Sequence, residues 1–146
     1  MKLFTSVLSA FSFGSVALGQ FVQIGAPTNM TSVIPGGPIS VRIDRPNFQS
    51  SALEIALVIG ISTCGTGPCP GPVDGVIGTI LYNGPYNPQQ PPDSTIPPLP
   101  PHQYFNGTVP DFLPSGYAQL TVAHFSLVGA ANGPLFETLS EVLVVA

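Results

Sequence analysis

The sequence predicts an all-β fold, built as an antiparallel sandwich of two sheets, and three observations carry this prediction. Helical periodicity is absent after residue 20, where glycine and proline recur too often for helices of ordinary length. Short runs rich in β-branched residues occur instead, and turn residues separate them. About seven such runs in one domain are typical of an immunoglobulin-like sandwich.

The strands can be placed one by one from their residue patterns. Residues 39–44 alternate apolar and polar side chains, as a half-buried strand does, and follow a Pro-Gly-Gly-Pro turn at 35–38. Residues 53–61 are almost entirely apolar, which is typical of a central strand. In chain order, the expected strands are 21–24, 39–44, 53–61, 76–82, 104–109, 117–127 and 135–145. The hallmarks of antibody domains are missing, because the chain has no tryptophan and its two cysteines are too close to bridge two sheets.

Residues 1–19 have the pattern of a secretory signal peptide. Lys2 is followed by an apolar, serine-containing stretch, and Ala17 and Gly19 are the small residues that precede a cleavage before Gln20. An N-terminal membrane anchor is the alternative, but the stretch is shorter than the roughly 18 apolar residues of a span. We therefore expect a secreted, extracellular protein with one domain at 20–146.

Charged residues are scarce, and the formal net charge of the chain is −4 at pH 7. After cleavage, only Arg42 and Arg45 are basic, which argues against nucleic-acid binding and against anionic membrane surfaces. N-linked glycans would help to solubilise such a chain. Two sequons are present, and they make Asn29 and Asn106 the candidate N-glycosylation sites.

Cys64 and Cys69 are the two cysteines, and they flank a short segment of glycine, threonine and proline. In a secreted chain, an even number of cysteines predicts a disulfide, which here would tie a loop tip rather than the core. A redox pair is the first alternative, but it usually has two intervening residues at the start of a helix. Half of a metal site is the second, and only His102 and His124 could complete it.

A proline-rich segment at 85–101 interrupts the regular spacing of the strands, with eight prolines. Proline lacks the backbone N–H that a sheet ladder needs, so this segment should be an exposed loop with polyproline-II character. It is interpreted as a stiff connection that crosses from one sheet to the other. The alternative is a docking strip, because residues 96–101 contain a PxxP pattern.

The search for catalytic groups leaves His124 as the main candidate. It shares a strand face with Leu120 and Val122, which suggests a half-buried histidine with a backbone partner. Ser126 lies on the same face, but no acidic residue can be placed beside the pair, and His102 is expected to be solvated in the proline-rich loop. Motifs for a nucleophile elbow or a zinc protease are absent. The sequence therefore predicts no catalytic residues, no cofactor and no metal.

An ordered series of short motifs resembles one family of secreted fungal proteins. The series contains IPGGPISVRI, NFQSSALEIALVIG, GTILY with a following Gly-Pro, PSG, and SLVGAANGPL, at residues 34–43, 47–60, 78–85, 114–116 and 126–135. In this order and spacing, the chain is similar to the Nis1-like necrosis-inducing secreted effectors. The cysteine loop and the long proline-rich segment are departures from that pattern.

The resemblance implies an immunoglobulin-like, non-catalytic effector that binds receptor-associated immune kinases of a plant host and suppresses immunity. An exposed apolar strip next to the turn at 129–135 would support this interpretation. The first alternative is a module that binds cell-wall carbohydrate, which needs aromatic side chains in a row on one face. Its candidates are Tyr82, Tyr86, Tyr104, Phe105 and Tyr117. The second alternative is a small hydrolase that uses His124.

Overall fold

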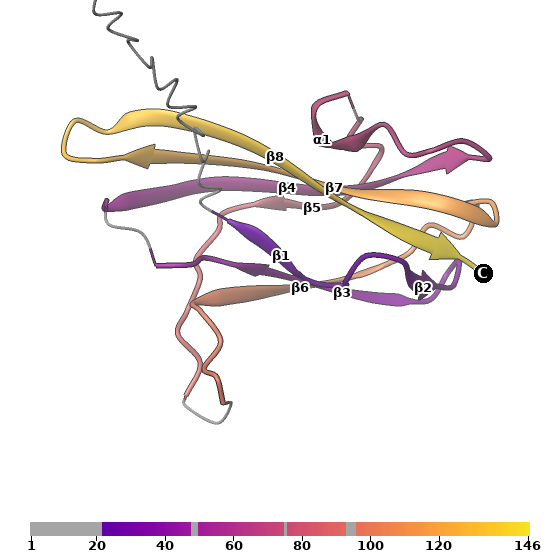
Figure 1. Ribbon diagram of the computed structural model, residues 1–146, viewed down its shortest axis with the longest axis horizontal. Helices are drawn as coiled ribbons and strands as arrows, with labels where there is room; N and C mark the ends of the chain where they lie inside the picture. Colours follow the sequence, from indigo (N-terminus) through magenta and orange to yellow (C-terminus); the bar gives the residue numbers. More distant parts are fainter. Residues whose placement is uncertain (1–21, 48–49, 75, 93–95) are drawn as a thin grey trace, which may run out of the picture.

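Two β-sheets face each other in the computed structural model, which describes residues 22–146 apart from 48–49, 75 and 93–95 (Figure 1). The signal peptide at 1–19 lies outside the described residues. Within them, the chain is all-β, as the sequence predicts, with α1 (Gly71–Asp74) as a single helical turn. This part of the chain contains no helix that is long and apolar enough to cross a membrane.

The smaller sheet has the order β1-β3-β6, with all pairs antiparallel. Its strands are β1 (Gln23–Ala26), β3 (Pro38–Asp44) and β6 (His102–Thr108). The alternation predicted for β3 is confirmed, because Ile39, Val41 and Ile43 are buried between the sheets.

The larger sheet has the order β2-β8-β7-β4-β5. Its strands are β2 (Thr31–Val33), β8 (Gly133–Val145), β7 (Gly116–Val128), β4 (Ala52–Gly65) and β5 (Thr79–Gly84). The long hairpin of β7 and β8 pairs without interruption from Val128↔Gly133 to Gly116↔Val145. It forms one end of the sandwich with the start of β4, on the left in Figure 1.

The strand count and one strand direction differ from the prediction. The described residues contain eight strands rather than about seven, because β2 has no counterpart in the sequence prediction. β2 pairs in parallel with β8, in the register Thr31↔Leu143. The prediction of an antiparallel sandwich was therefore wrong for this pair of strands. A three-residue strand shows no periodicity, and only its hydrogen bonds to β8 make it a strand.

Apolar side chains from both sheets fill the space between them. The largest fully buried ones are Ile43, Leu57, Ile59, Ile61, Leu120 and Leu143. They come from β3, β4, β7 and β8, so the smaller sheet packs against the three longest strands of the larger sheet. Burial of such side chains is the main favourable contribution to folding.

Two connections follow the sequence predictions in part. The Cys64–Cys69 disulfide is present and closes a loop tip at the end of β4. The proline-rich segment joins β5 in one sheet to β6 in the other, so it is the predicted crossing between sheets and hangs below the body in Figure 1. The prediction of a wholly exposed loop was wrong at Tyr86, which is 3% exposed and packs in the core.

Candidate functional site

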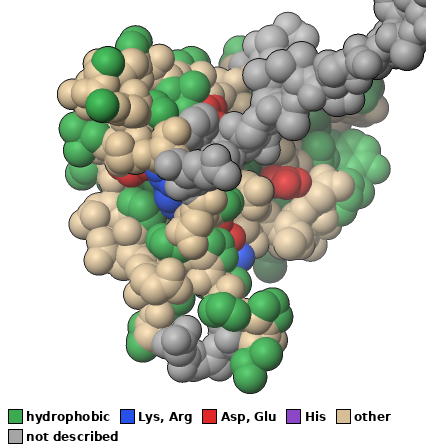
Figure 2. All heavy atoms as spheres, turned by 60° about the vertical axis from the view of Figure 1, so that its left-hand side comes forward, with side chains coloured by type: hydrophobic (Ala, Val, Ile, Leu, Met, Phe, Trp, Pro, Cys, Tyr) green, Lys and Arg blue, Asp and Glu red, His purple; other side chains and the backbone are tan. Residues whose placement is uncertain are grey.

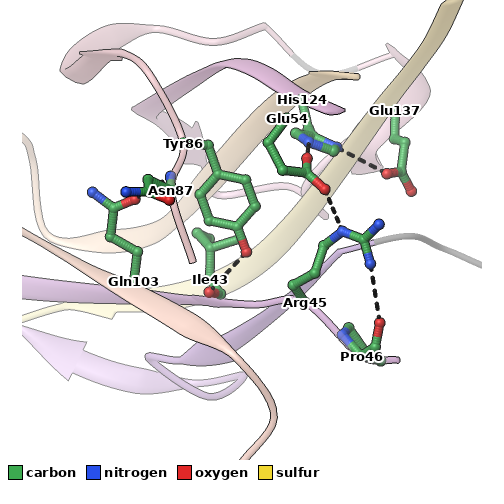
Figure 3. Close-up of polar contacts among 9 residues, drawn as sticks. All are labelled: Ile43, Arg45, Pro46, Glu54, Tyr86, Asn87, Gln103, His124 and Glu137. Carbon is green, nitrogen blue, oxygen red and sulfur yellow. Dashed lines mark hydrogen bonds and ion pairs between the residues drawn. The ribbon is translucent and has the colours of Figure 1, made fainter. Parts of the chain in front are cut away.

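Charged side chains gather inside the sandwich at the β7–β8 turn end (Figure 3). His124 is fully buried and lies between two carboxylates, with Nε2 at 2.5 Å from Glu54 and Nδ1 at 3.0 Å from Glu137. The guanidinium of Arg45 donates to the other oxygen of Glu54. We refer to Arg45, Glu54, His124 and Glu137 as the buried charge cluster.

Three strands and one strand end supply the buried charge cluster. His124 on β7 and Glu137 on β8 are direct partners in the hairpin, so pairing alone places them side by side. Arg45 directly follows the last residue of β3, which is a strand of the smaller sheet. Its ion pair with Glu54 on β4 connects the two sheets across the interior.

A β-bulge in β4 is what turns Glu54 inward. The pairing of β4 with β7 shifts register between Glu54 and Ala56, which leaves Ile55 as an extra residue. Glu54 and Leu57 both reach the interior although three positions separate them, an odd spacing that a regular strand places on opposite faces. The same shift leaves Leu53 exposed.

Mutual hydrogen bonds favour the charged forms of Glu54 and His124. Burial alone would raise the pKa of the Glu54 carboxyl, but the bonds from His124 and Arg45 outweigh it and hold that pKa below its ordinary 4.5. Burial also disfavours charge on His124, but its bonds to Glu137 and Glu54 outweigh it and raise the imidazole pKa above 6.5. The imidazolium form donates from both nitrogens, which matches both carboxylate contacts.

Tyr86 closes the cluster on the side of the smaller sheet (Figure 3). Its hydroxyl donates to the backbone oxygen of Ile43 at 3.1 Å, and its ring lies edge-on to the His124 ring at 5.6 Å. Burial raises the pKa of the Tyr86 phenol above its ordinary 10.0. The hydroxyl thus stays neutral and holds the crossing segment against β3.

The pKa directions predict a stability maximum at mildly acidic pH. The raised pKa of His124 gives stability that is complete below 6.5 and is lost as the pH rises through its folded value. The lowered pKa of Glu54 gives stability that is complete above 4.5 and is lost as the pH falls through its folded value. We expect the thermal unfolding midpoint to be highest between these two values, in a series from about pH 3 to about pH 9.

Replacing each histidine in turn tests whether His124 causes the loss of stability at alkaline pH. His124→Gln should flatten the decline on the alkaline side, because no group in the cluster would then titrate there. His102→Gln is the matched control and should leave that decline unchanged, because His102 begins β6 and lies outside the buried charge cluster. An equally steep decline in His124→Gln would show that another group causes it.

The cluster geometry does not suit His124 as a general base. Each ring nitrogen already faces a carboxylate, so neither is placed to accept a proton from Ser126. Ser126 is also fully buried, and its Oγ has no hydrogen-bond partner among the residues that the structure describes. The shared face with Leu120 and Val122 is confirmed, but a half-buried His124 with a backbone partner was wrong. His102 is also not a loop residue, because β6 begins with it.

The outer face of the larger sheet carries an apolar strip directly behind the buried charge cluster. Its members are Leu53, Ile55, Phe125, Leu127 and Phe136, and this set keeps the name apolar strip below. Because His124 and Ser126 point inward, Phe125 and Leu127 point outward. Leu53 pairs with Leu127, and Phe125 pairs with Phe136, so the strip is continuous over three strands.

Part of this strip is strongly exposed to solvent. Phe136 is 67% exposed and Leu53 is 56% exposed, although both are large apolar side chains. Figure 2, turned so that this end comes forward, shows hydrophobic side chains in several separate patches and charged ones in a few small areas. The strip adjoins the turn between β7 and β8, where the sequence interpretation places a contact surface.

Comparison with known protein families confirms the family resemblance that was drawn from the short motifs. The family model of the Nis1 family matches residues 17–143, which is most of the chain. The chain belongs to the Nis1 family. No curated protein matches the sequence significantly. Membership in the Nis1 family points to a fungal effector-type protein, and the disulfide is consistent with secretion.

The aromatic residues considered for carbohydrate binding do not form one exposed row in this Nis1-family protein. Phe105 and Tyr86 are buried, and the Tyr82 ring packs against Phe105 with centroids 4.4 Å apart. Tyr104 and Tyr117 are exposed but lie on different sheets. The structure therefore does not bring these five residues together on a surface.

The predicted modification sites have solvent-exposed acceptor residues. Asn29 lies in the turn before β2, and Asn106 lies on β6 opposite Ser40. Among the residues that the structure describes, no group of three or more histidine, cysteine or acidic side chains has the arrangement of a metal site.

Proposed function

We propose that this Nis1-family protein is a secreted, non-catalytic effector that binds immune-signalling proteins of a plant host and suppresses their response. Family membership supports the effector role. The observation that carries the mode of action is the apolar strip, because large exposed apolar patches on soluble proteins mark interaction sites. The partners implied by the family resemblance are receptor-associated immune kinases.

The buried charge cluster makes the part of the sheet that carries the apolar strip rigid. The strands that carry the strip on their outer face are joined on their inner face by the bonds of Glu54, His124 and Glu137. The backbone of a rigid sheet has little conformational freedom to lose on binding, and this lowers the entropic cost of association. The contacts of His124 support the absence of catalysis, because both nitrogens are engaged with carboxylates.

The immunoglobulin-like assignment is part of the same proposal. The order β1-β3-β6 fits strands A-B-E of such a domain, and β8-β7-β4-β5 fits strands G-F-C-C′ of the variable type. β2 is added beside the last strand. In this assignment, the apolar strip occupies the outer face of the sheet that contains the last strand.

Replacement of Phe136 tests the proposed contact surface. We expect Phe136→Ser to weaken binding to the kinase partner by about 30-fold or more, as loss of an aromatic side chain at the centre of an interface does. Suppression of the oxidative burst in plant tissue should be lost in parallel. The fold should persist, because a surface substitution changes the unfolding free energy by only about 0.5 kcal/mol.

Phe112 provides a matched control for this experiment. It is 71% exposed but follows β6, outside the apolar strip, so Phe112→Ser should suppress the burst as well as the unmodified protein. Equal suppression by Phe136→Ser would remove the strip as the contact surface. An unmodified, folded protein that neither binds immune kinases nor alters the burst would overturn the effector role itself.

A further inference from the structure

A surface hollow lies beside the sequon at Asn29. It has a volume of about 300 Å³ and is lined by Asn29, Met30, Pro68, Cys69, Tyr117 and Val142. Apart from Asn29, these side chains are apolar or aromatic, and Tyr117 and Met30 remain 43% and 48% exposed. The hollow is at the lower end of the size range of small-ligand sites, which is about 300–1,000 Å³.

Separate segments of the chain fix this hollow in place. The backbone N–H of Met30 donates to the Val142 oxygen at 2.6 Å, which anchors the turn containing Asn29 to β8. The Cys64–Cys69 disulfide holds the loop with Pro68 against the end of β4. Tyr117 points outward from β7, because its neighbour Ala118 is buried.

The sequon defines the chemistry that is available at this place. In the secretory pathway, the side-chain amide nitrogen of Asn29 would bond to the anomeric carbon of the first N-acetylglucosamine of a lipid-pyrophosphate-linked oligosaccharide. The bond from that carbon to the pyrophosphate oxygen breaks, the lipid pyrophosphate leaves, and one amide proton is lost. An N-acetylglucosamine thus attached starts at the rim of the hollow.

We infer that Asn29 carries an N-linked glycan whose first N-acetylglucosamine packs into this hollow against Tyr117. A sugar ring has an apolar face of C–H groups, and an aromatic ring is a large, rigid apolar surface that can lie against it. The attachment point keeps the sugar close at no further entropic cost of association, since the link is covalent. The glycan covers apolar surface that is otherwise left in water.

The second sequon serves as an internal contrast. Asn106 borders a hollow of only about 10 Å³, which holds no sugar ring. A glycan on Asn106 would project into solvent from the exposed side of β6. The inference is therefore specific to Asn29 and requires passage through the secretory pathway, but it does not depend on the effector role.

The test uses the full-length chain secreted by a eukaryotic cell and purified from the medium. Mass spectrometry of peptides should find the sugar on Asn29. Removal of the outer sugars with an endoglycosidase that leaves one N-acetylglucosamine should leave the thermal midpoint unchanged. Asn29→Gln should lower the midpoint by about 3–5 °C, while Asn106→Gln should not lower it.

Two further comparisons separate sugar packing from effects of the asparagine itself. In bacterially produced protein, which lacks the glycan, Asn29→Gln should match the unmodified sequence. Tyr117→Ser should lower the midpoint more in the glycosylated protein than in the bacterial one. The inference is overturned if Asn29 carries no sugar, both in protein purified from the medium and in protein recovered from the cells. Equal effects of Tyr117→Ser in both forms overturn it as well.

Discussion

Glu54→Ala is expected to lower the free energy of unfolding by about 3–5 kcal/mol, because it breaks a buried charge network from one side. Arg45 and His124 would both lose the carboxylate that they share. His124 is fully buried, so water cannot replace that contact without opening the end of the sandwich. Denaturant unfolding at mildly acidic pH measures the loss directly.

The same variant should also change the pH profile. With Glu54 gone, a hydrogen bond that raises the pKa of His124 is lost, so stability should decline less steeply on the alkaline side. Asp111→Ala is the matched control, because Asp111 is an exposed acid whose removal should change stability by only about 0.5 kcal/mol. If Glu54→Ala is as stable as Asp111→Ala, the cluster does not hold the sheets together.

Gly60→Ala should destabilise the protein by about 3 kcal/mol, although it adds only one methyl group. A Cβ at Gly60 would collide with the backbone oxygen of Ile77 and lie 2.5 Å from its Cγ2 atom. The obstacle includes backbone, which cannot rotate away as a side-chain end can. The segment just before β5 would have to move away from β4 near the register shift between Ile59 and Gly60.

Gly67 offers a control of the same chemical size. A Cβ there would meet nothing within 4 Å, and the residue has no positive φ, so Gly67→Ala should be neutral or slightly stabilising. Thermal unfolding of both variants should show a clear loss for Gly60→Ala alone. Similar midpoints for the two would mean that the approach of residue 77 to β4 is not tight in solution.

The fold was largely predictable because the long strands follow local rules. In β3, apolar residues alternate with polar ones, and those at 39, 41 and 43 are buried as period-two patterning requires. The prolines of 85–101 cannot pair within a sheet, and the segment is indeed the crossing between sheets. β2 was not predicted because its residues show no strand periodicity, and its partner strand lies more than a hundred positions later in the chain.

The site was predictable only in part. The sequence placed His124 on the inner face of a strand, and the shared motifs indicated the family to which the chain belongs. It could not place an acid beside that histidine. Glu137 reaches His124 through the register of the hairpin, and regular alternation from Leu57 would have turned Glu54 outward.

By itself, the sequence determined the all-β class, the disulfide and the inner face of β7, because residue type and neighbour spacing decide these features locally. The tertiary structure alone decided which way Glu54 and Leu53 point. A single extra residue in β4 inverts the faces of the strand, and pairing with β7 rather than the local sequence sets where that residue falls. That one shift places the carboxylate inside the sandwich and leaves the leucine on the apolar strip outside.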